Sequence, residues 1–365
     1  MSNKLTAISL FSGMGGDTLG MKNAGIIVKA FSEKIDIIRQ THLKNFPNCN
    51  ILGSDVSSDI TKITDDEFRS YENNIDIVFA GFPCQGFSNA GKKKLNDPRN
   101  TLFREFVRAT KLIQPKIIIG ENVKGLLSRK TTNGDKYIDI IQQEFIKLGY
   151  SIIYKVFKCY KYGIPQKRER LIILGIKKEL VNTYNLSFPN EDDRVPNLMD
   201  IVKFNMTGAI KIEKITPDDI PFDMTSIPDE CILTDMSNTE TENNPHPYLK
   251  LKALARNVIY KDKTHPTLLS FSKRGSPIHS EIIDIRKPSK TIICTYNHQP
   301  RLLVPLKNKN GYFIRCLLPN ELKQIQGFPV NYNIIGNNKQ KIIQIGNAVP
   351  PPLIEQIMKH ILGCV

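Results

Sequence analysis

The stretch IDIVFAGFPCQGFS, residues 75–88, decides how the rest of the chain is interpreted. Its opening run, Ile75–Ala80, is apolar and bounded by turn residues, which predicts a buried β-strand. The glycines and the proline that follow end this strand and lift the thiol of Cys84 above the edge of a sheet. A cysteine in that position, followed by a long polar loop, suggests a nucleophile under a movable lid. The ordinary alternative is a small buried hydrophobic residue, so the surrounding motifs must decide.

On both sides of this stretch, apolar runs alternate with helical patterns through residues 5–180. This alternation is typical of an α/β fold with a mostly parallel sheet, helices on both faces and ligands at the carboxyl ends of the strands. The predicted strands are Leu5–Phe11, Ile26–Ser32, Ile75–Ala80, Lys116–Gly120, Ser151–Phe157 and Arg170–Gly175, and the predicted helices include Lys34–Asn45, Leu102–Ile113 and Tyr137–Leu148.

A change of texture divides the chain. Between residues 182 and 285 the segments shorten and polar clusters interrupt the pattern, which predicts a smaller irregular domain with little helix. Regular patterns return near the end, with an apolar bias over Lys341–Ile345 and a helical pattern over Pro351–Ile361. We therefore predict a first domain over residues 1–182 that is completed by 338–365, and a second domain with a hinge over 183–337.

The composition favours a soluble protein with an anionic partner. Lys and Arg number 51 against 36 Asp and Glu, which gives a net charge of +15. Such an excess favours nucleic acid, because each phosphate contact releases condensed counterions, although a basic surface without a partner is also common. No apolar run reaches the ~18 residues that a membrane span needs, and no signal-peptide pattern begins the chain. We therefore expect a cytoplasmic protein without a membrane contact.

The 7 cysteines are scattered along the sequence. None forms a Cys-x-x-Cys pair, and none has a histidine at zinc-finger spacing. We therefore expect reduced thiols, no disulfide framework and no metal site. One of these thiols can then serve as a nucleophile.

The first predicted strand runs directly into a glycine loop, FSGMGGD, residues 11–17, which a helix follows. Gly13, Gly15 and Gly16 would let a ligand approach backbone N–H groups at the N-terminus of that helix. A dinucleotide fingerprint needs a third glycine where Thr18 stands. The spacing therefore argues against a pyrophosphate cradle.

Acidic residues follow the next two apolar segments. Glu33 ends the second predicted strand, where a carboxylate can hold the two hydroxyls of a ribose. Asp55 and Val56 come later and could contact the edge and the face of an adenine. Together these residues describe a site for an adenosine-bearing ligand with little phosphate dependence, which S-adenosylmethionine fits. Each alone could equally be a turn glycine or a surface acid.

Beyond the cysteine loop, two further motifs are expected at the same edge of the sheet. The strand Lys116–Gly120 delivers Glu121, and the motif QKRER, residues 166–170, precedes the last predicted strand. A thiol, a carboxyl group and the two arginines Arg168 and Arg170 should therefore converge. The alternative is that the arginines form ordinary surface ion pairs.

With these motifs, the sequence closely resembles the DNA (cytosine-5)-methyltransferase family. The resemblance covers nearly the whole chain except about residues 182–285 and keeps the family's motif order. It implies a Rossmann-like, S-adenosylmethionine-dependent methyltransferase domain, with the irregular region as a target recognition domain. The matching stretches are Phe11–Gly16, Glu33, Asp55, Gly81–Ser88, Glu121–Val123, Gln166–Arg170, Lys287–Thr291, Glu321 with Gln326–Pro329, and Gly346–Pro350.

The resemblance also implies a mechanism. The Cys84 thiolate would add to C6 of cytosine, which makes C5 nucleophilic enough to take a methyl group from S-adenosylmethionine. Glu121 would contact N3 and the exocyclic amine, Arg170 would bind the O2 atom, and Arg168 would lie near the reacting thiol. As a donor to N3, Glu121 would need a pKa that burial has raised.

Cofactor contacts carry over from the family in the same way. Phe11 would stack on the adenine and Glu33 would bind the ribose, while Asn347 and Val349 would close the methionine end. The whole set that the resemblance implies is Phe11, Gly13, Gly15, Gly16, Glu33, Asp55, Val56, Pro83, Leu102, Asn347 and Val349.

DNA contacts are expected from two regions, because the target base must leave the duplex before it can be attacked. Gln85 and Ser88 lie on the expected lid with three consecutive lysines, which could equally form a solvated loop. Basic residues of the recognition region could contact phosphates or base edges. The candidates are Gln85, Ser88, Lys92, Lys93, Lys94, Arg256, Lys273 and Arg274.

Three other interpretations are weighed against a monomeric enzyme that methylates double-stranded DNA. One branch of the same family modifies tRNA, but it usually carries Cys-Phe-Thr where this chain has Cys231-Ile232-Leu233. A nicotinamide-dependent oxidoreductase conflicts with Thr18, and a non-catalytic DNA-binding module need not keep the thiol, the carboxyl group and both arginines. The enzyme could act alone or protect DNA from a restriction endonuclease that it need not contact.

Overall fold

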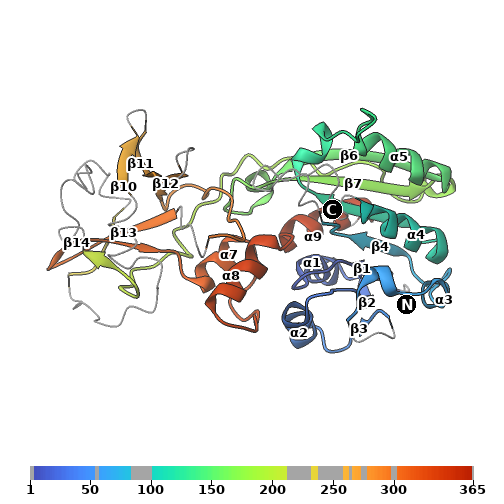
Figure 1. The fold of residues 1–365 in the computed structure, drawn as a ribbon, viewed down its shortest axis with the longest axis horizontal. Coiled ribbons are helices and arrows are strands. Elements are labelled where there is room, and N and C mark those ends of the chain that lie inside the picture. The colour runs from blue at the N-terminus through green and yellow to red at the C-terminus, as the bar shows by residue number, and fades with distance from the viewer. Residues whose placement is uncertain are drawn as a thin grey trace.

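The computed structural model describes residues 4–53, 57–83, 101–211, 232–236, 258–262, 265–272, 278–296 and 302–363. Two sheets lie at opposite ends of the molecule, and helices α7 (Pro319–Ile325) and α8 (Asn338–Asn347) lie between them (Figure 1). The first sheet is covered by the other helices. The predicted α/β fold is confirmed for this part of the chain.

The first sheet has the strand order β3-β2-β1-β4-β5-β7-β6. Four neighbouring pairs are parallel, and β7 is antiparallel to both β5 and β6, so the sheet is mostly parallel as predicted. Each of the six predicted strands is present, and the two-residue β3 is additional. The strands are β1 (Thr6–Leu10), β2 (Ile27–Phe31), β3 (Asn50–Ile51), β4 (Ile77–Ala80), β5 (Ile117–Asn122), β6 (Tyr150–Lys158) and β7 (Glu169–Lys177).

Helices cover both faces of this sheet, which explains why its strands are continuous apolar runs. In β4, Ile77 and Phe79 belong to one core and Val78 and Ala80 to the other, because successive side chains point to opposite faces. The first core takes residues from α1 (Gly16–Asn23), α2 (Asp36–Asn45) and α9 (Pro351–Ile361). The second takes residues from α3 (Asp65–Arg69), α4 (Phe103–Ile113) and α5 (Tyr137–Lys147).

The second sheet is built partly from residues 182–285, for which the sequence predicts an irregular domain, and partly from residues 302–316 that follow it. Its strand order is β10-β11-β12-β13-β14-β8, and β9 pairs with β13. Much of this sheet is antiparallel and several of its strands are very short, so the alternation of strands and helices that reveals the first sheet is missing. The strands are β8 (Ile210–Lys211), β9 (Leu233–Thr234), β10 (Val258–Asp262), β11 (His265–Ser272), β12 (Ile278–Ile282), β13 (Leu302–Asn308) and β14 (Gly311–Cys316).

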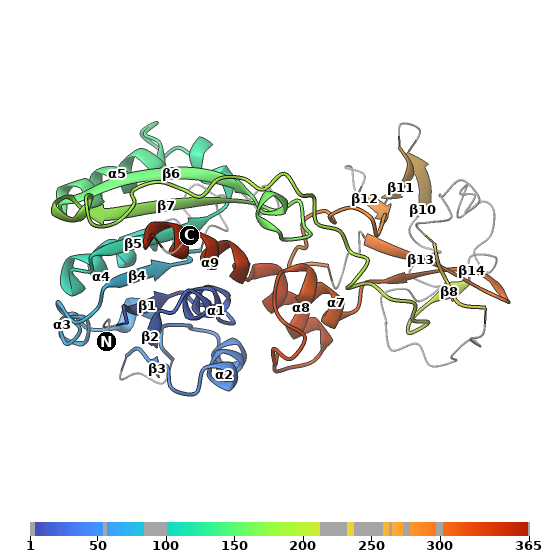
Figure 2. The same ribbon diagram turned by 180° about the vertical axis from the view of Figure 1, so that it is seen from behind.

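The last described helix packs on the helices of the first sheet. Helix α9 packs against α1, and the two lie side by side in both views (Figures 1 and 2). The approach is close at Gly20, where an added Cβ would lie 2.5 Å from the carbonyl oxygen of Pro351. No helix in the described part of the chain is long and apolar enough to cross a bilayer.

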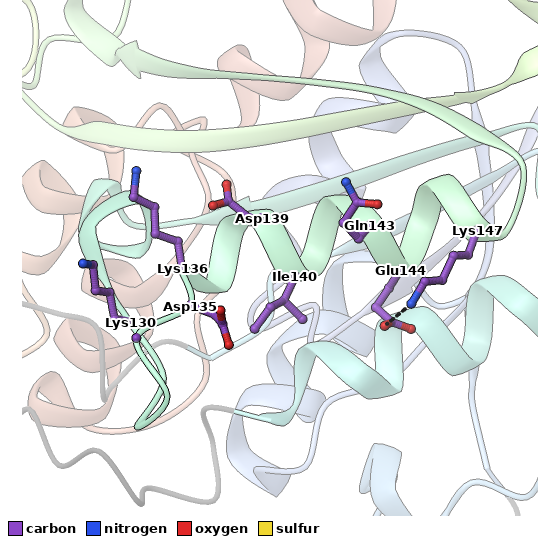
Figure 3. Close-up of a pocket in the computed structure, with 9 residues that line it drawn as sticks. Lys130, Asp135, Lys136, Asp139, Ile140, Gln143, Glu144 and Lys147 are labelled. Atoms are coloured by element: carbon purple, nitrogen blue, oxygen red, sulfur yellow. Dashed lines mark hydrogen bonds and ion pairs between the residues drawn. The ribbon is translucent and has the colours of Figure 1, made fainter.

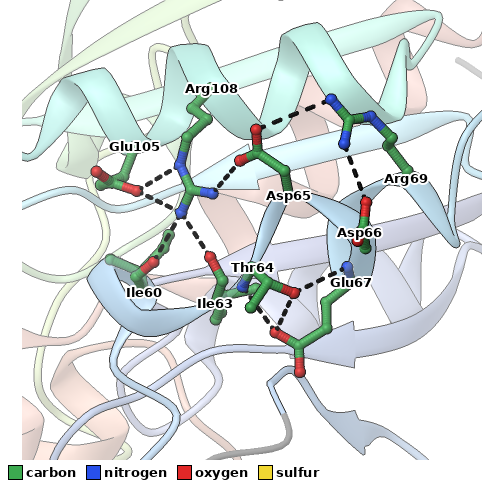
Figure 4. Close-up of polar contacts among 9 residues, drawn as sticks. All are labelled: Ile60, Ile63, Thr64, Asp65, Asp66, Glu67, Arg69, Glu105 and Arg108. Carbon is green, nitrogen blue, oxygen red and sulfur yellow. Dashed lines mark hydrogen bonds and ion pairs between the residues drawn. The ribbon is translucent and has the colours of Figure 1, made fainter.

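An arginine on α4 fixes the segment that follows β3 (Figure 4). The Arg108 guanidinium pairs with Glu105 and Asp65, each at 2.7 Å, and donates to the carbonyl oxygens of Ile60 and Ile63 at 3.1 and 2.9 Å. Because this group is 27% exposed, its value lies in satisfying two main-chain carbonyls as much as in charge pairing. It ties the loop before α3 to the start of α4.

A buried ion pair joins the second sheet to α7. Arg315 on β14 is fully buried and forms two hydrogen bonds with the carboxylate of Glu321, at 2.7 and 2.8 Å. Its remaining N–H groups donate to the carbonyl oxygens of Lys203, Asn205 and Cys316. All five donors of the guanidinium therefore have acceptors, which a buried arginine requires.

We predict that Arg315→Met lowers the free energy of unfolding by about 3–5 kcal/mol, because the Glu321 carboxylate would stay buried without its partner. Urea denaturation followed by circular dichroism measures this change. The control is Arg194→Met, which removes an exposed pair with Asp192 and should leave the denaturation midpoint unchanged. An equal response of the two variants would contradict the structural role of Arg315.

Candidate functional site

Three strand ends meet at the edge of the first sheet where the catalytic motifs were expected. The parallel strands β4 and β5 end there, at Ala80 and Asn122. Strand β7 begins there because it runs antiparallel to β5, with Leu171 opposite Asn122. The arginines at the start of β7 are thereby brought to the carboxyl ends of the parallel strands.

Glu121 and Arg170 form an ion pair at this edge. The Arg170 Nε lies 2.8 Å from Glu121 Oε1, and both side chains are largely buried, at 14% and 11% exposure. Arg170 also donates from Nη1 to the carbonyl oxygen of Glu169 at 2.7 Å. The pair holds a carboxylate in a fixed position beside the strand end that leads to the cysteine loop.

Asn122 connects that carboxylate to the cysteine loop. Its Nδ2 donates to the carbonyl oxygen of Phe82 at 3.2 Å, and its Oδ1 accepts the N–H of Val123 at 2.8 Å. The chain is thus fixed up to Pro83, where the described segment ends. Cys84 itself lies outside the described residues, as do the lid candidates Gln85, Ser88, Lys92, Lys93 and Lys94.

Arg168 has a different environment from Arg170. It is 1% exposed, and its guanidinium donates to three main-chain carbonyl oxygens: Ile292 at 3.3 Å, Gly346 at 3.1 Å and Ala348 at 3.0 Å. These contacts join the start of β7 to Ile292, to the last turn of α8 and to Ala348 directly after it. A position of Arg168 near the reacting thiol stays a prediction, and these three contacts are with main-chain carbonyl oxygens.

The glycine loop is attached to the end of β2. Phe11 has a left-handed backbone with φ of 55°, and its N–H donates to Ser32 Oγ at 3.2 Å. The N–H groups of Gly13 and Ile35 donate to the two oxygens of Glu33, at 3.1 and 2.8 Å. Burial raises the pKa of Glu33 above its ordinary value, although the hydrogen bonds from these two N–H groups act to lower it. The loop thus places a carboxylate beside backbone N–H groups at the carboxyl ends of two strands.

The three glycines of the loop have different surroundings. No atom of the described residues lies within 4 Å of a Cβ built on Gly13, so among these residues this position leaves room for a ligand. A Cβ on Gly15 would lie 2.7 Å from Phe46, and one on Gly16 would lie 2.0 Å from the carbonyl oxygen of Val349. Gly15 and Gly16 therefore admit other parts of the protein, which spacing in the sequence could not distinguish from ligand contact.

The other expected cofactor residues that the structure describes surround the same edge. The Gly81 N–H donates to the Leu10 carbonyl oxygen at 3.1 Å, so the strand end before Pro83 lies beside the glycine loop. A Cβ on Gly81 would be 3.6 Å from the Phe11 carbonyl oxygen and 3.9 Å from Val349 Cγ2. Leu102 precedes α4, and Asn347 is exposed at the end of α8. Asp55, Val56, Arg256, Lys273 and Arg274 lie outside the described residues.

A buried polar network beneath the glycine loop was not expected from the sequence. The carboxylate of Asp17 accepts hydrogen bonds from the hydroxyls of Ser9 and Ser12, and the Thr18 hydroxyl bridges Ser12 to His42 Nε2. Burial raises the pKa of Asp17 to about 6, although these hydrogen bonds lower it. Burial lowers the pKa of His42 to about 3, so the imidazole is neutral at pH 7. The available signal was Asp17 itself, a charged residue in an otherwise apolar and small-residue turn.

A shallow hollow on the outer face of α5 is separate from this edge (Figure 3). It is lined by charged and polar side chains that include Lys130, Lys136, Asp139 and Glu144. None of the residues that the sequence motifs selected lines it. Within the described residues, no group of three or more His, Cys, Asp or Glu side chains is placed to hold a metal ion.

The fold is that of a Rossmann-like α/β enzyme, a class whose ligands bind at the carboxyl ends of the parallel strands. The chain belongs to the C-5 cytosine-specific DNA methylase family, whose model matches residues 5–363. It is thus a DNA (cytosine-5)-methyltransferase. The family resemblance inferred from the motifs is confirmed.

Individual relatives cover nearly the whole chain. The Type II methyltransferase M.Eco47II of Escherichia coli is 30% identical over 99% of this chain and 79% of its own length. M.FnuDI of Fusobacterium nucleatum is 30% identical over 97% of this chain and 93% of its own length. Among solved structures, a DNA modification methyltransferase encoded within an E. coli prophage has a TM-score of 0.61 at 24% identity, covering 98% of each chain. Spodoptera frugiperda DNMT2 has a TM-score of 0.63 at 17% identity, covering 98% of this chain and 99% of its own. These two structures support the fold.

We predict that Asp17→Asn becomes more stabilising as the pH rises from 4 to 7. Asp17 titrates near its ordinary 3.8 when unfolded and at about 6 when folded. The folded chain therefore binds more protons in this window, and stability falls as the pH rises through it. The variant should gain about 2 kcal/mol relative to the wild type across the window.

Urea midpoints at several pH values measure this gain. Asp76→Asn is the control of opposite sign: burial raises the pKa of Asp76, but the hydrogen bonds from Lys116 and Thr6 and the charge of Lys116 together outweigh burial, so the pKa is lowered. That variant should lose stability relative to the wild type as the pH rises. Parallel curves for the wild type and Asp17→Asn would contradict the buried titration.

Proposed function

We propose that this enzyme transfers a methyl group from S-adenosylmethionine to C5 of a flipped-out cytosine in a short duplex site, as the modification enzyme of a Type II restriction-modification system. The family membership and the Type II methyltransferases among its relatives support this assignment. The observation that carries it is the hydrogen bond from Asn122 to Phe82, because it joins the carboxylate-bearing end of β5 to the chain two residues before Cys84.

The proposed nucleophile is Cys84. Its thiolate adds to C6 of the cytosine, and the electron pair of the C5–C6 double bond makes C5 nucleophilic. After C5 has taken the methyl group, a base removes the C5 proton and the thiolate leaves, which restores the double bond. Sulfur suits both directions, because it is a good nucleophile as thiolate and a competent leaving group.

Glu121 and Arg170 are proposed to hold the ring during this addition. Negative charge develops on the base, so fixed polar groups at N3 and O2 stabilise the transition state. The 2.8 Å ion pair restrains both side chains before the base arrives. Glu121 would face N3 and the exocyclic amine, and Arg170 would face O2.

The glycine loop fits an adenosine-bearing cofactor. Among the described residues, nothing lies within 4 Å of a Cβ built on Gly13, and Glu33 keeps acceptor capacity beyond its two backbone hydrogen bonds, since a carboxylate has about four lone-pair sites. Phe11, Glu33 and Val349 would hold the adenine, ribose and methionine parts, respectively. S-adenosylmethionine, when bound, supplies a methyl group activated by a sulfonium ion.

DNA binding is proposed to use the +15 net charge and the residues assigned to the lid and the recognition region. The lysines at 92–94 would contact phosphates while Gln85 and Ser88 occupy the space left by the flipped base. Arg256, Lys273 and Arg274 would contact phosphates or base edges from the recognition region. The proposed division is a catalytic domain over 1–182 and 338–365 and a recognition domain with hinge over 183–337.

The substrate is tested by radiolabelled methyl transfer from S-adenosylmethionine to unmethylated duplex DNA and to tRNA in parallel, followed by bisulfite sequencing. We expect label in DNA at one repeated sequence context. Label in tRNA alone would overturn the DNA assignment and favour the tRNA branch of the family. Label in neither substrate, with the cofactor bound, would contradict the proposed activity.

We predict that Cys84→Ser lowers methyl transfer by more than about 10³-fold, because a hydroxyl is not ionised near neutral pH and removal of a nucleophile has effects of this size. Cofactor affinity, measured by calorimetry, should remain. Cys294→Ser is the control, since it changes a partly exposed thiol outside the proposed site and should keep full activity. Lost cofactor binding with unchanged turnover per bound cofactor would contradict the nucleophile assignment.

A further inference from the structure

Two buried glutamine side chains connect the segment around Ile292, within the proposed recognition domain and hinge (183–337), to the segment that follows α8. Gln166 and Gln326 are both fully buried, and Gln326 lies at the end of α7, between the two sheets (Figure 2). Gln166 Nε2 donates to Gln326 Oε1 at 2.6 Å. At one end, the Ile292 N–H donates to Gln166 Oε1 at 3.0 Å, and at the other, Gln326 Nε2 donates to the Ala348 carbonyl oxygen at 2.6 Å.

The direction of this relay is fixed by its ends. A backbone N–H can only donate and a backbone carbonyl can only accept, so each amide must accept from the hinge side and donate toward Ala348. The orientation of both amides therefore follows from the network, although nitrogen and oxygen are otherwise hard to distinguish. Shifting any one member would leave a buried polar group without its partner, which is costly.

The relay ends at a carbonyl that is also held from a second side. Arg168 Nη2 donates to the same Ala348 oxygen at 3.0 Å, so both lone pairs of this acceptor are used. The adjoining Val349 carbonyl oxygen lies where a Cβ on Gly16 would be 2.0 Å away. A displacement of Ala348 would therefore be passed directly to the N-terminus of α1 and the glycine loop.

We propose that Gln326 is a positioning residue that couples the hinge of the recognition region to the cofactor site, through Gln166 on one side and Ala348 on the other. Gln326 touches neither substrate nor cofactor in this role. It sets the position of Asn347 and Val349, which are assigned to the methionine end of the cofactor. The inference rests on the proposed function, since it requires that S-adenosylmethionine binds there.

The test compares Gln326→Glu with Gln344→Glu at pH 8. An ionised carboxylate at position 326 keeps the acceptor for Gln166 but places a lone pair against the Ala348 carbonyl. Gln344 is a matched control, because its buried Nε2 also donates to a carbonyl oxygen, that of Ile335 at 2.8 Å, outside the relay. We expect Gln326→Glu to raise KM for S-adenosylmethionine about tenfold, the size of one lost buried hydrogen bond, with kcat at saturating cofactor nearly unchanged.

Gln344→Glu should keep the wild-type KM. Calorimetric titration of the wild type and all variants with S-adenosylmethionine distinguishes a failure of the proposed function from a failure of the coupling. Wild-type protein that binds no S-adenosylmethionine would overturn the proposed function and this inference together. Equal affinities of the wild type and of folded Gln326→Glu for S-adenosylmethionine would overturn the coupling alone. Should Gln326→Glu not fold, Gln166→Glu removes the donor to Gln326 and must weaken cofactor binding in the same direction.

Discussion

The reversed direction of β7 is the constraint on which the candidate site depends. β7 lies between β5 and β6 and runs antiparallel to both, so its first residues lie at the edge where the parallel strands end. A parallel strand in this place would carry Arg170 to the opposite edge, a full strand length from Glu121. The glycine loop and the end of β4 share this edge because β1 and β4 are parallel, and the ion pair lies at the same edge because β7 is reversed.

A second constraint is that this edge is closed by distant parts of the chain. The segment after α8 lies against Gly16, and α9 packs on α1. Arg168 donates hydrogen bonds to the carbonyl oxygens of Gly346 and Ala348 at the end of α8 and to that of Ile292. The site is thus assembled from the two ends of the sequence and its middle, and main-chain polar groups do much of the joining. Side chains that do not contact a substrate can therefore determine the geometry of the candidate site.

The sequence predicts the first sheet well because both of its faces are buried. Runs such as Ile77–Ala80 are wholly apolar, and the turn residues around them mark their ends. The second sheet could not be predicted, since β8 and β9 contain two residues each and gain their stability from strands far along the chain. Within the candidate site, the motifs predict Glu121 and Arg170 at one edge of the sheet, and the structure adds that the two side chains are in contact there. Motifs could not show that Gly16 faces Val349, nor that Asp17 is buried with two serines, because those surroundings arise only from tertiary packing.

The packing of α9 on α1 has a consequence for the order of events during synthesis. Helix α1 leaves the ribosome long before α9, yet Met21 of the former and Ile354 of the latter belong to one core. The apolar side of α1 therefore stays uncovered until α9 has been synthesised. Such closure between distant segments is slow and leaves hydrophobic surface exposed in the meantime. A nascent chain would accordingly have a complete second core, over α3, α4 and α5, well before its glycine loop reaches its final shape.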